Sequence, residues 1–204
     1  MNTQVRSRIV IVVVAALAFS PLPGFAQATS TFSGRAVALR ANAVGISLAL
    51  SDTGPLPASG GNLKTSVASV DVAGLVTVDV LSGATSGSGS SSKSQASVAN
   101  VNLLGGLVAA DVVKANTSAT CSGGSASTSG SSEIVGLVVA GLPVLNLNPN
   151  LAISLPGGLS LIVNEQTSSS SGANSGSMTV NGLHITGPSI DIVVSSAQSG
   201  ITCA

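Results

Sequence analysis

From about residue 29 onward, the chain alternates blocks rich in valine, leucine and isoleucine with blocks rich in serine, glycine and threonine. Inside the apolar blocks, hydrophobic and polar residues alternate one by one at 76–80 and 178–180, the pattern of strands with one buried face. The good helix formers Glu, Lys, Gln and Arg are scarce, while β-branched residues are common. The pattern therefore predicts a succession of β-strands.

Turn signals separate the apolar blocks at 52–55, 59–62, 148–150, 156–158 and 187–188, where Gly, Pro, Asn and Asp cluster. Three longer Ser/Gly tracts, at 86–94, 122–132 and 168–177, lie at regular places between β-patterned segments. This placement favours the tips of long hairpins over flexible linkers. The expected fold is all-β: an antiparallel sandwich or a barrel-like stack of long hairpins with Ser/Gly-rich tips.

A weak internal repeat accompanies the strands. Segment 74–81 matches segment 106–113, and a looser third copy lies at 190–194. Repeated hairpins stacked side by side would produce this similarity, and a β-solenoid is the alternative that it leaves open.

The N-terminus has the pattern of a secretory signal peptide. Arg6 and Arg8 precede an apolar run at 9–19, which is too short for a bilayer because a spanning helix needs about 20 residues. An A-x-A cleavage site then follows, formed by Ala26 and Ala28.

Cleavage is expected before Thr29, so that 1–28 is the signal peptide and 29–204 is a single all-β secreted domain. The expected location is extracellular, at the cell surface or periplasmic. No transmembrane anchor is expected in the mature chain, because later apolar stretches such as 134–147 are interrupted by Gly and Pro.

The two cysteines lie in similar segments, 111–121 and 191–203, each of which ends in Cys. An exported chain with exactly these two, Cys121 and Cys203, is expected to pair them in a disulfide. Strict alternation would place two sets of residues on shared strand faces: Val113, Ala115, Ala119 and Cys121 on one, and Val193, Ala197, Ile201 and Cys203 on the other.

The composition of the chain argues against several classes of function. Only 7% of residues are charged, 7 basic and 7 acidic, and 1% are aromatic. Loss of Arg6 and Arg8 would leave 5 basic residues against 7 acidic ones, a net charge of −2. Binding to nucleic acid or to anionic membranes requires a cluster of basic residues, so this balance of charges does not favour either partner. With one His and two Cys, no metal or cofactor site is expected.

Catalytic signals are sparse. His184 is the single imidazole, and no G-x-S-x-G nucleophile motif occurs. We expect no enzymatic activity. The enzyme alternative is a hydrolase or lyase of an extracellular polymer that uses Glu133, Glu165 or His184.

Several short segments, in this order, resemble the choice-of-anchor P family of secreted bacterial proteins: Ser33-Gly34-Arg35-Ala36, Asp52-Thr53-Gly54-Pro55-Leu56-Pro57, 103–111, the strand containing Cys121, Val163-Asn164-Glu165-Gln166-Thr167 and 180–185. The resemblance covers essentially all of 29–204. It implies a bacterial exported or surface protein without an established activity, whose relatives often carry C-terminal anchoring signals. This chain ends at Cys203-Ala204 without a sorting tail, so release or non-covalent retention is expected rather than covalent attachment.

The leading functional hypothesis is an exported, non-enzymatic surface or extracellular structural/interaction protein. Its expected interactions are self-association or an envelope or matrix partner. A self-assembling filament or matrix subunit is one alternative, because strands rich in Ser, Thr and Gly with little charge are suited to edge-to-edge pairing. The extracellular polymer hydrolase or lyase is the other.

Overall fold

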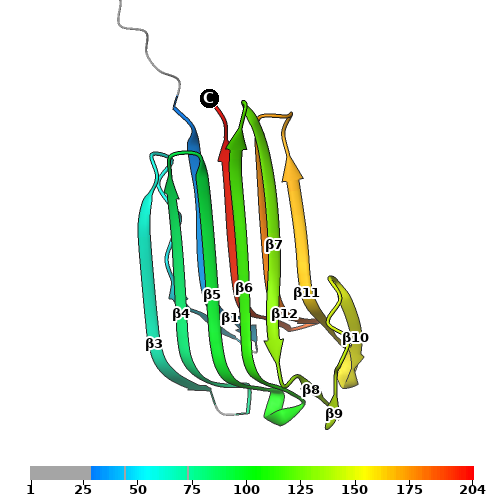
Figure 1. Ribbon diagram of the computed structural model, residues 1–204. Coiled ribbons are helices and arrows are strands. Elements are labelled where there is room, and N and C mark those ends of the chain that lie inside the picture. Colours follow the sequence, from blue (N-terminus) through cyan, green and yellow to red (C-terminus); the bar gives the residue numbers. More distant parts are fainter. Residues whose placement is uncertain (1–28, 44, 73) are drawn as a thin grey trace, which may run out of the picture.

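The computed structural model describes residues 29–43, 45–72 and 74–204. In this part of the chain most residues are in antiparallel strands, arranged as two sheets that pack face to face (Figure 1). The predicted signal peptide and its cleavage residues Ala26 and Ala28 lie outside the described residues.

One sheet has six strands. In spatial order they are β10 (Leu151–Leu155), β11 (Leu159–Ser170), β12 (Ser175–Gly187), β13 (Ile190–Thr202), β1 (Thr31–Ala43) and β2 (Ile46–Asp52). Strand β1 lies between β2 and β13, so the beginning and the end of the described chain are neighbours in this sheet.

The other sheet has seven strands. In spatial order they are β3 (Gly61–Val72), β4 (Val76–Ser88), β5 (Ser91–Leu103), β6 (Val108–Ser122), β8 (Val138–Val139) and β9 (Leu142–Pro143), with β7 (Ser125–Val135) also paired to β6. Two single-turn 3₁₀ segments, Leu104–Gly106 and Pro156–Gly158, connect strands.

The all-β sandwich expected from the sequence is confirmed. The β-solenoid alternative is wrong, because neighbouring strands pair antiparallel in two facing sheets. The three Ser/Gly tracts contain the β4–β5, β6–β7 and β11–β12 turns, and all three turns lie at the same end of the sandwich (Figure 1). The repeated segments 74–81, 106–113 and 190–194 contain the starts of β4, β6 and β13.

Because the hairpins are long, the aliphatic blocks and the Ser/Gly-rich blocks of the sequence lie at opposite ends of the interior. Towards the starts of β4 and β6, the core is a large aliphatic cluster with members such as Leu39, Leu103 and Leu183, all fully buried. Towards the Ser/Gly tips it consists of small clusters around Phe32 and Met178 and of buried hydroxyls. The block pattern of the sequence therefore becomes a division of the core along the strands.

Small residues let the sheets approach closely in the tip half. At Gly83 of β4, an added Cβ would lie 2.7 Å from the carbonyl oxygen of Ser51 and 3.2 Å from that of Ala36, both in the opposite sheet. Gly34 and Gly182 also have no room for a Cβ, because side chains of the facing sheet occupy the space. The two backbones are nearly in contact here, a packing that only glycine permits.

Buried hydroxyl groups join the sheets where aliphatic side chains would not fit. Thr117 Oγ1 and Ser199 Oγ lie 2.8 Å apart, one from each sheet. Ser92 Oγ donates to the carbonyl of Ser33 at 2.8 Å, and Ser94 Oγ donates to that of Gln198 at 2.5 Å. Since buried polar groups are costly unless they are paired, these bonds explain how a serine-rich interior remains stable.

Substitution of Thr117 by valine tests this network. Valine keeps the shape of threonine but removes the hydroxyl bond, which leaves Ser199 Oγ only its longer bond, 3.3 Å, to the backbone carbonyl of residue 117. We therefore expect a loss of about 1 kcal/mol in the free energy of unfolding. Urea denaturation measures the loss. The matched control is Thr120→Val on the same strand, which is exposed and should change stability by less than about 0.5 kcal/mol. Equal losses in the two variants would contradict the proposed role of the buried hydroxyls.

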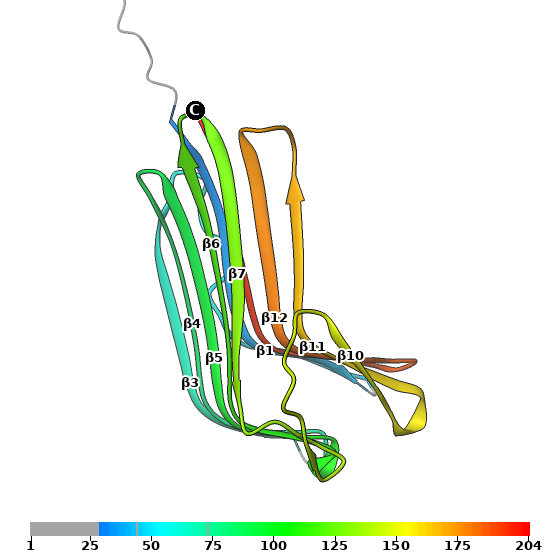
Figure 2. The same ribbon diagram turned by 45° about the vertical axis from the view of Figure 1, so that its right-hand side comes forward.

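Both sheets bend in the same direction about two-thirds of the way from the tips (Figure 2). Non-glycine residues with positive φ lie at this level in both sheets. They are Ser51, Asn164 and Ser195 on alternate strands of the six-stranded sheet, and Val80 and Asn100 on the adjacent strands β4 and β5 of the seven-stranded sheet. The hydroxyls of Ser51 and Ser195 are buried and donate across the sandwich, to the carbonyls of Leu81 and Val113. These two bonds tie the bend of one sheet to the other.

The bend corrects two predictions based on strict alternation. Val76 and Val78 are buried as predicted, but Val80, with φ of 47°, is 64% exposed, and Leu81 is buried in its place. In β13, Val193 does not share a face with Ala197, because Ser195 lies between them with φ of 57°. Val193 pairs with His184 and Arg40, while its neighbour Val194 joins the core.

Candidate functional site

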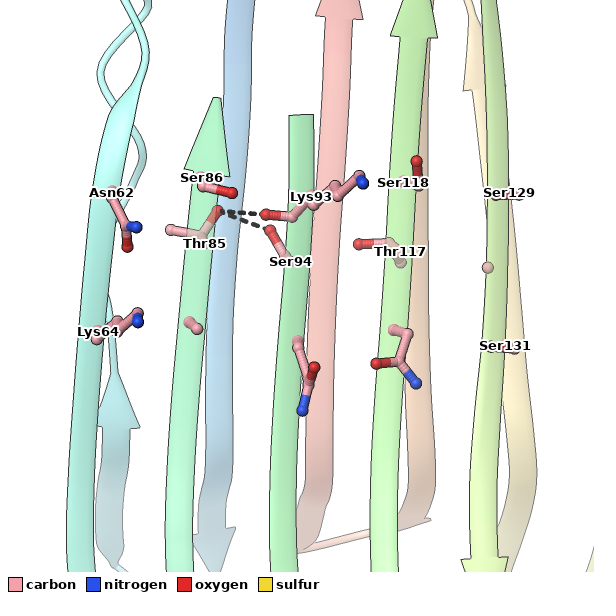
Figure 3. Close-up of a pocket in the computed structure, with 14 residues that line it drawn as sticks. Asn62, Lys64, Thr85, Ser86, Lys93, Ser94, Thr117, Ser118, Ser129 and Ser131 are labelled. Carbon is pink, nitrogen blue, oxygen red and sulfur yellow. Dashed lines mark hydrogen bonds between the residues drawn. The ribbon is translucent and has the colours of Figure 1, made fainter. Parts of the chain in front are cut away.

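The outer face of the seven-stranded sheet is hollowed into a shallow groove of about 530 Å³ (Figure 3). Strands β3 to β7 place two rows of outward side chains across it. The row nearer the tips is Asn62, Ser86, Lys93, Ser118 and Ser129. The next row is Lys64, Ala84, Gln95, Asn116 and Ser131. We call this surface the groove face.

The charge on the groove face has one sign. The fourteen residues that line the groove include two lysines and no acidic residue. Lys114, one row further along, is 3.8 Å from Glu133 and is therefore partly neutralised. Within the described residues, Lys64 and Lys93 form no ion pair.

Hydroxyl and amide groups supply the remaining chemistry of the groove face. Its serines, together with Asn62, Gln95 and Asn116, offer donors and acceptors on a nearly flat surface. An aromatic stacking platform is missing from it, because Phe32, the one aromatic residue among those described, is buried between the sheets. The face can therefore bind a partner through hydrogen bonds and positive charge, without stacking.

A second polar cluster lies on the outer face of the six-stranded sheet, where the bend makes that face concave (Figure 2). Glu165 Oε2 accepts hydrogen bonds from Asn181 Nδ2 at 2.6 Å and pairs with His184 Nδ1 at 2.8 Å. On the other side of the ring, His184 Nε2 is 3.4 Å from Asp191 Oδ1. The His184 side chain is only 17% exposed, which is low for the outer face of a sheet.

The three residues of the enzyme alternative do not form one site. Glu165 and His184 meet, whereas Glu133 lies on the other sheet beside Lys114 and is 63% exposed. His184 Nδ1 is hydrogen-bonded to Glu165, whereas Nε2 lies 3.4 Å from Asp191 Oδ1 without a hydrogen bond. No serine or threonine hydroxyl of the described residues is hydrogen-bonded to this ring, so the Ser-His pair of a hydrolase is not formed here.

Arg35 and Asp52 form an ion pair on the same outer face. Arg35 Nε donates to Asp52 Oδ1 at 2.9 Å, and its Nη2 donates to Oδ2. Hydrogen bonds to the carboxylate hold the pKa of Asp52 below its usual value of 3.8. The bond from the Arg35 guanidinium has the larger effect, and the bond from the Gly54 amide has the smaller one.

A pH effect on stability follows from this pair. A carboxyl group with a lowered pKa in the folded state stabilises the fold above its unfolded pKa, and this contribution is lost as the pH falls through the folded value. Asp52→Asn should therefore cost up to about 1 kcal/mol at pH 7, and the cost should become smaller as the pH falls from 4 towards 2. Melting temperatures of both proteins across this range measure the difference. A cost that is the same at pH 7 and at pH 2 would contradict the assignment.

The cysteines form the disulfide Cys121–Cys203, with Cα atoms 5.7 Å apart. Cys121 is near the end of β6 and Cys203 directly follows β13, so the bond joins the two sheets at the tip end. On either side of the bond, the amides of Cys121 and Cys203 donate to the carbonyls of Ser90 and Asn174 in neighbouring tips.

Fold and surface together define an antiparallel β-sandwich, closed by a disulfide at one end, with a flat polar face that carries lysines. In the part of the chain that the structure describes, no helix has the length and apolar character needed to cross a membrane. The chain matches no protein-family model, no curated protein and no solved structure, and its resemblance to the choice-of-anchor P family stays a prediction.

Proposed function

We propose that this protein is exported and works outside the cell as a non-enzymatic surface or structural/interaction module that binds an envelope or matrix partner through the groove face. The observation that carries the proposal is the groove face itself, a broad surface of hydroxyls, amides and unpaired lysines that spans five strands. Such a surface offers many weak polar contacts to an extended partner.

Two further features support export. The disulfide is of the kind that persists in oxidising compartments. The predicted signal peptide at 1–28 would deliver the chain to one. The choice-of-anchor resemblance agrees with a surface location and belongs to the same proposal.

Self-assembly is the second candidate function, and the strand edges favour it. β3 and β7 are the edge strands of the seven-stranded sheet in the tip half, with 12 and 11 residues. β7 carries a single charge, Glu133, so its edge has little to repel another strand. A filament or matrix subunit would use these edges rather than the groove face.

Retention of the secreted protein tests the proposal. In cells of the source organism, the wild-type chain should fractionate with washed cells or matrix, and Ser118→Glu should shift it into the medium by adding a charged, larger side chain to the groove face. The matched control is Thr179→Glu, on the outer face of the other sheet, which should leave retention unchanged.

Two results would contradict the proposal. Equal retention of the wild type and both variants would remove the groove face from the binding. Conversion of the wild-type secreted protein into large ordered species, measured by sedimentation, would favour the self-assembly candidate instead.

A further inference from the structure

Charge is unevenly distributed along the outer face of the seven-stranded sheet. In the tip half, the groove is lined by Lys64 and Lys93 and by no acidic residue. The acidic residues of the same sheet, Asp71, Asp79, Asp111 and Glu133, lie outside the groove, and Glu133 is beside Lys114. The outer face of the six-stranded sheet mixes acidic and basic groups in pairs, such as Arg35 with Asp52. The groove face is therefore a local patch of positive charge on a chain with almost no net charge.

The two unpaired lysines lie at a defined spacing. Lys64 is on β3 and Lys93 is on β5, two strands away. Gln95 of β5 is in the same row as Lys64, and Lys93 is two residues before Gln95. In ordinary strand geometry, two strand spacings are about 10 Å and two residues along a strand are about 7 Å. These two perpendicular components put the Cα atoms of the lysines about 12 Å apart. Both side chains are exposed and border the groove in Figure 3.

The groups between the lysines are suited to sugar hydroxyls. Ser86 and Gln95 lie between or beside the two ammonium groups, and Asn116 and Ser118 continue the surface across the next strand. Each of these side chains can donate and accept hydrogen bonds. Nucleic acid fits this surface less well, because no arginine lines the groove and the one aromatic ring among the described residues, that of Phe32, is buried.

We infer that the groove face binds an anionic polysaccharide, with Lys64 and Lys93 pairing with carboxylates on separate sugar units and the neighbouring amides and hydroxyls binding the ring hydroxyls. This inference rests on the proposed function and names the chemistry of its partner. A neutral polysaccharide would leave the two lysines without partners, so the acidic polymer fits the groove face better.

Binding of the secreted, oxidised protein to polygalacturonate tests the inference. The matched neutral probe is the fully methyl-esterified polymer, which has the same backbone without the charge. We expect binding to the acidic polymer alone, weakened by high salt because the lysines are exposed. The double variant Lys64→Gln/Lys93→Gln should weaken it about tenfold or more, whereas Lys64→Arg/Lys93→Arg should keep it. The charge control is Arg40→Gln, on the opposite face, which should have no effect.

Four outcomes would overturn the inference: no binding of the wild type to the acidic polymer, equal binding of the esterified polymer, no loss in the lysine-to-glutamine variant, or tighter binding of duplex DNA than of polygalacturonate. The retention assay separates this failure from failure of the proposed function. If the inference alone is wrong, Lys64→Gln/Lys93→Gln will remain with cells or matrix while Ser118→Glu is released. If the proposed function is wrong as well, Ser118→Glu will be retained too.

Discussion

Replacement of both Cys121 and Cys203 by alanine is expected to lower the free energy of unfolding by up to about 4.5 kcal/mol, the chain-entropy value for a loop of this length. The cysteines are 82 residues apart in sequence. Without the bond, the ends of β6 and β13 are held by packing and backbone bonds alone. For a domain of this size the melting temperature should fall by roughly 10 °C. Differential scanning calorimetry measures the change.

Reductant supplies the control for this prediction. Dithiothreitol should destabilise the wild type by a similar amount and leave the Cys121→Ala/Cys203→Ala variant unchanged, because the variant has no disulfide to reduce. A wild type that melts at the same temperature with and without reductant would show that the bond does not stabilise the junction of the sheets.

Substitution of Gly83 by valine should cost about 3 kcal/mol in the free energy of unfolding. The reason is steric: the Cβ position is 2.7 Å from the carbonyl oxygen of Ser51, which is backbone and cannot rotate away. The backbone of Gly83 itself is not in the left-handed region, so the strain comes from the facing sheet. Separation of the sheets at this point would also disturb the buried hydroxyl bonds nearby.

Ala84→Val is the matched control for this substitution. Ala84 is the next residue of β4 and lies on the groove face, where the two added methyl groups meet no opposing sheet. Urea denaturation should show a change of less than about 0.5 kcal/mol for Ala84→Val. If Gly83→Val were equally mild, the close approach of the sheets in the tip half would be wrong.

The strands and the hairpin tips could be predicted because their signals are local. Alternation, turn residues and the Ser/Gly tracts each report on a few neighbouring residues, and Met178 and Val180 are buried as that pattern implies. The prediction was wrong at Val80 and Val193 because bends with positive φ interrupt the two-residue period. No residue type marks these positions, since valine and serine rarely adopt that backbone conformation.

The candidate sites could not be predicted in the same way, because they depend on strand register. Lys64 and Lys93 are 29 positions apart, and only the pairing of β3, β4 and β5 places them on one face. The sequence singled out Glu165 and His184 as chemistry-bearing residues, but not their contact, which depends on the bend at Asn164. The net charge of the chain also gave no indication of the groove face, where the only charged residues among the lining side chains are Lys64 and Lys93.

The most direct test of the account is a nuclear magnetic resonance map of the groove face. The ¹⁵N-labelled, oxidised protein is titrated with a short galacturonate oligosaccharide, and shifts of the backbone amides are followed. The account predicts that the perturbed residues cluster at 62–64, 84–86, 93–95, 116–118 and 129–131. Perturbations centred instead on Glu165 and His184, or the absence of any saturable shift, would contradict it.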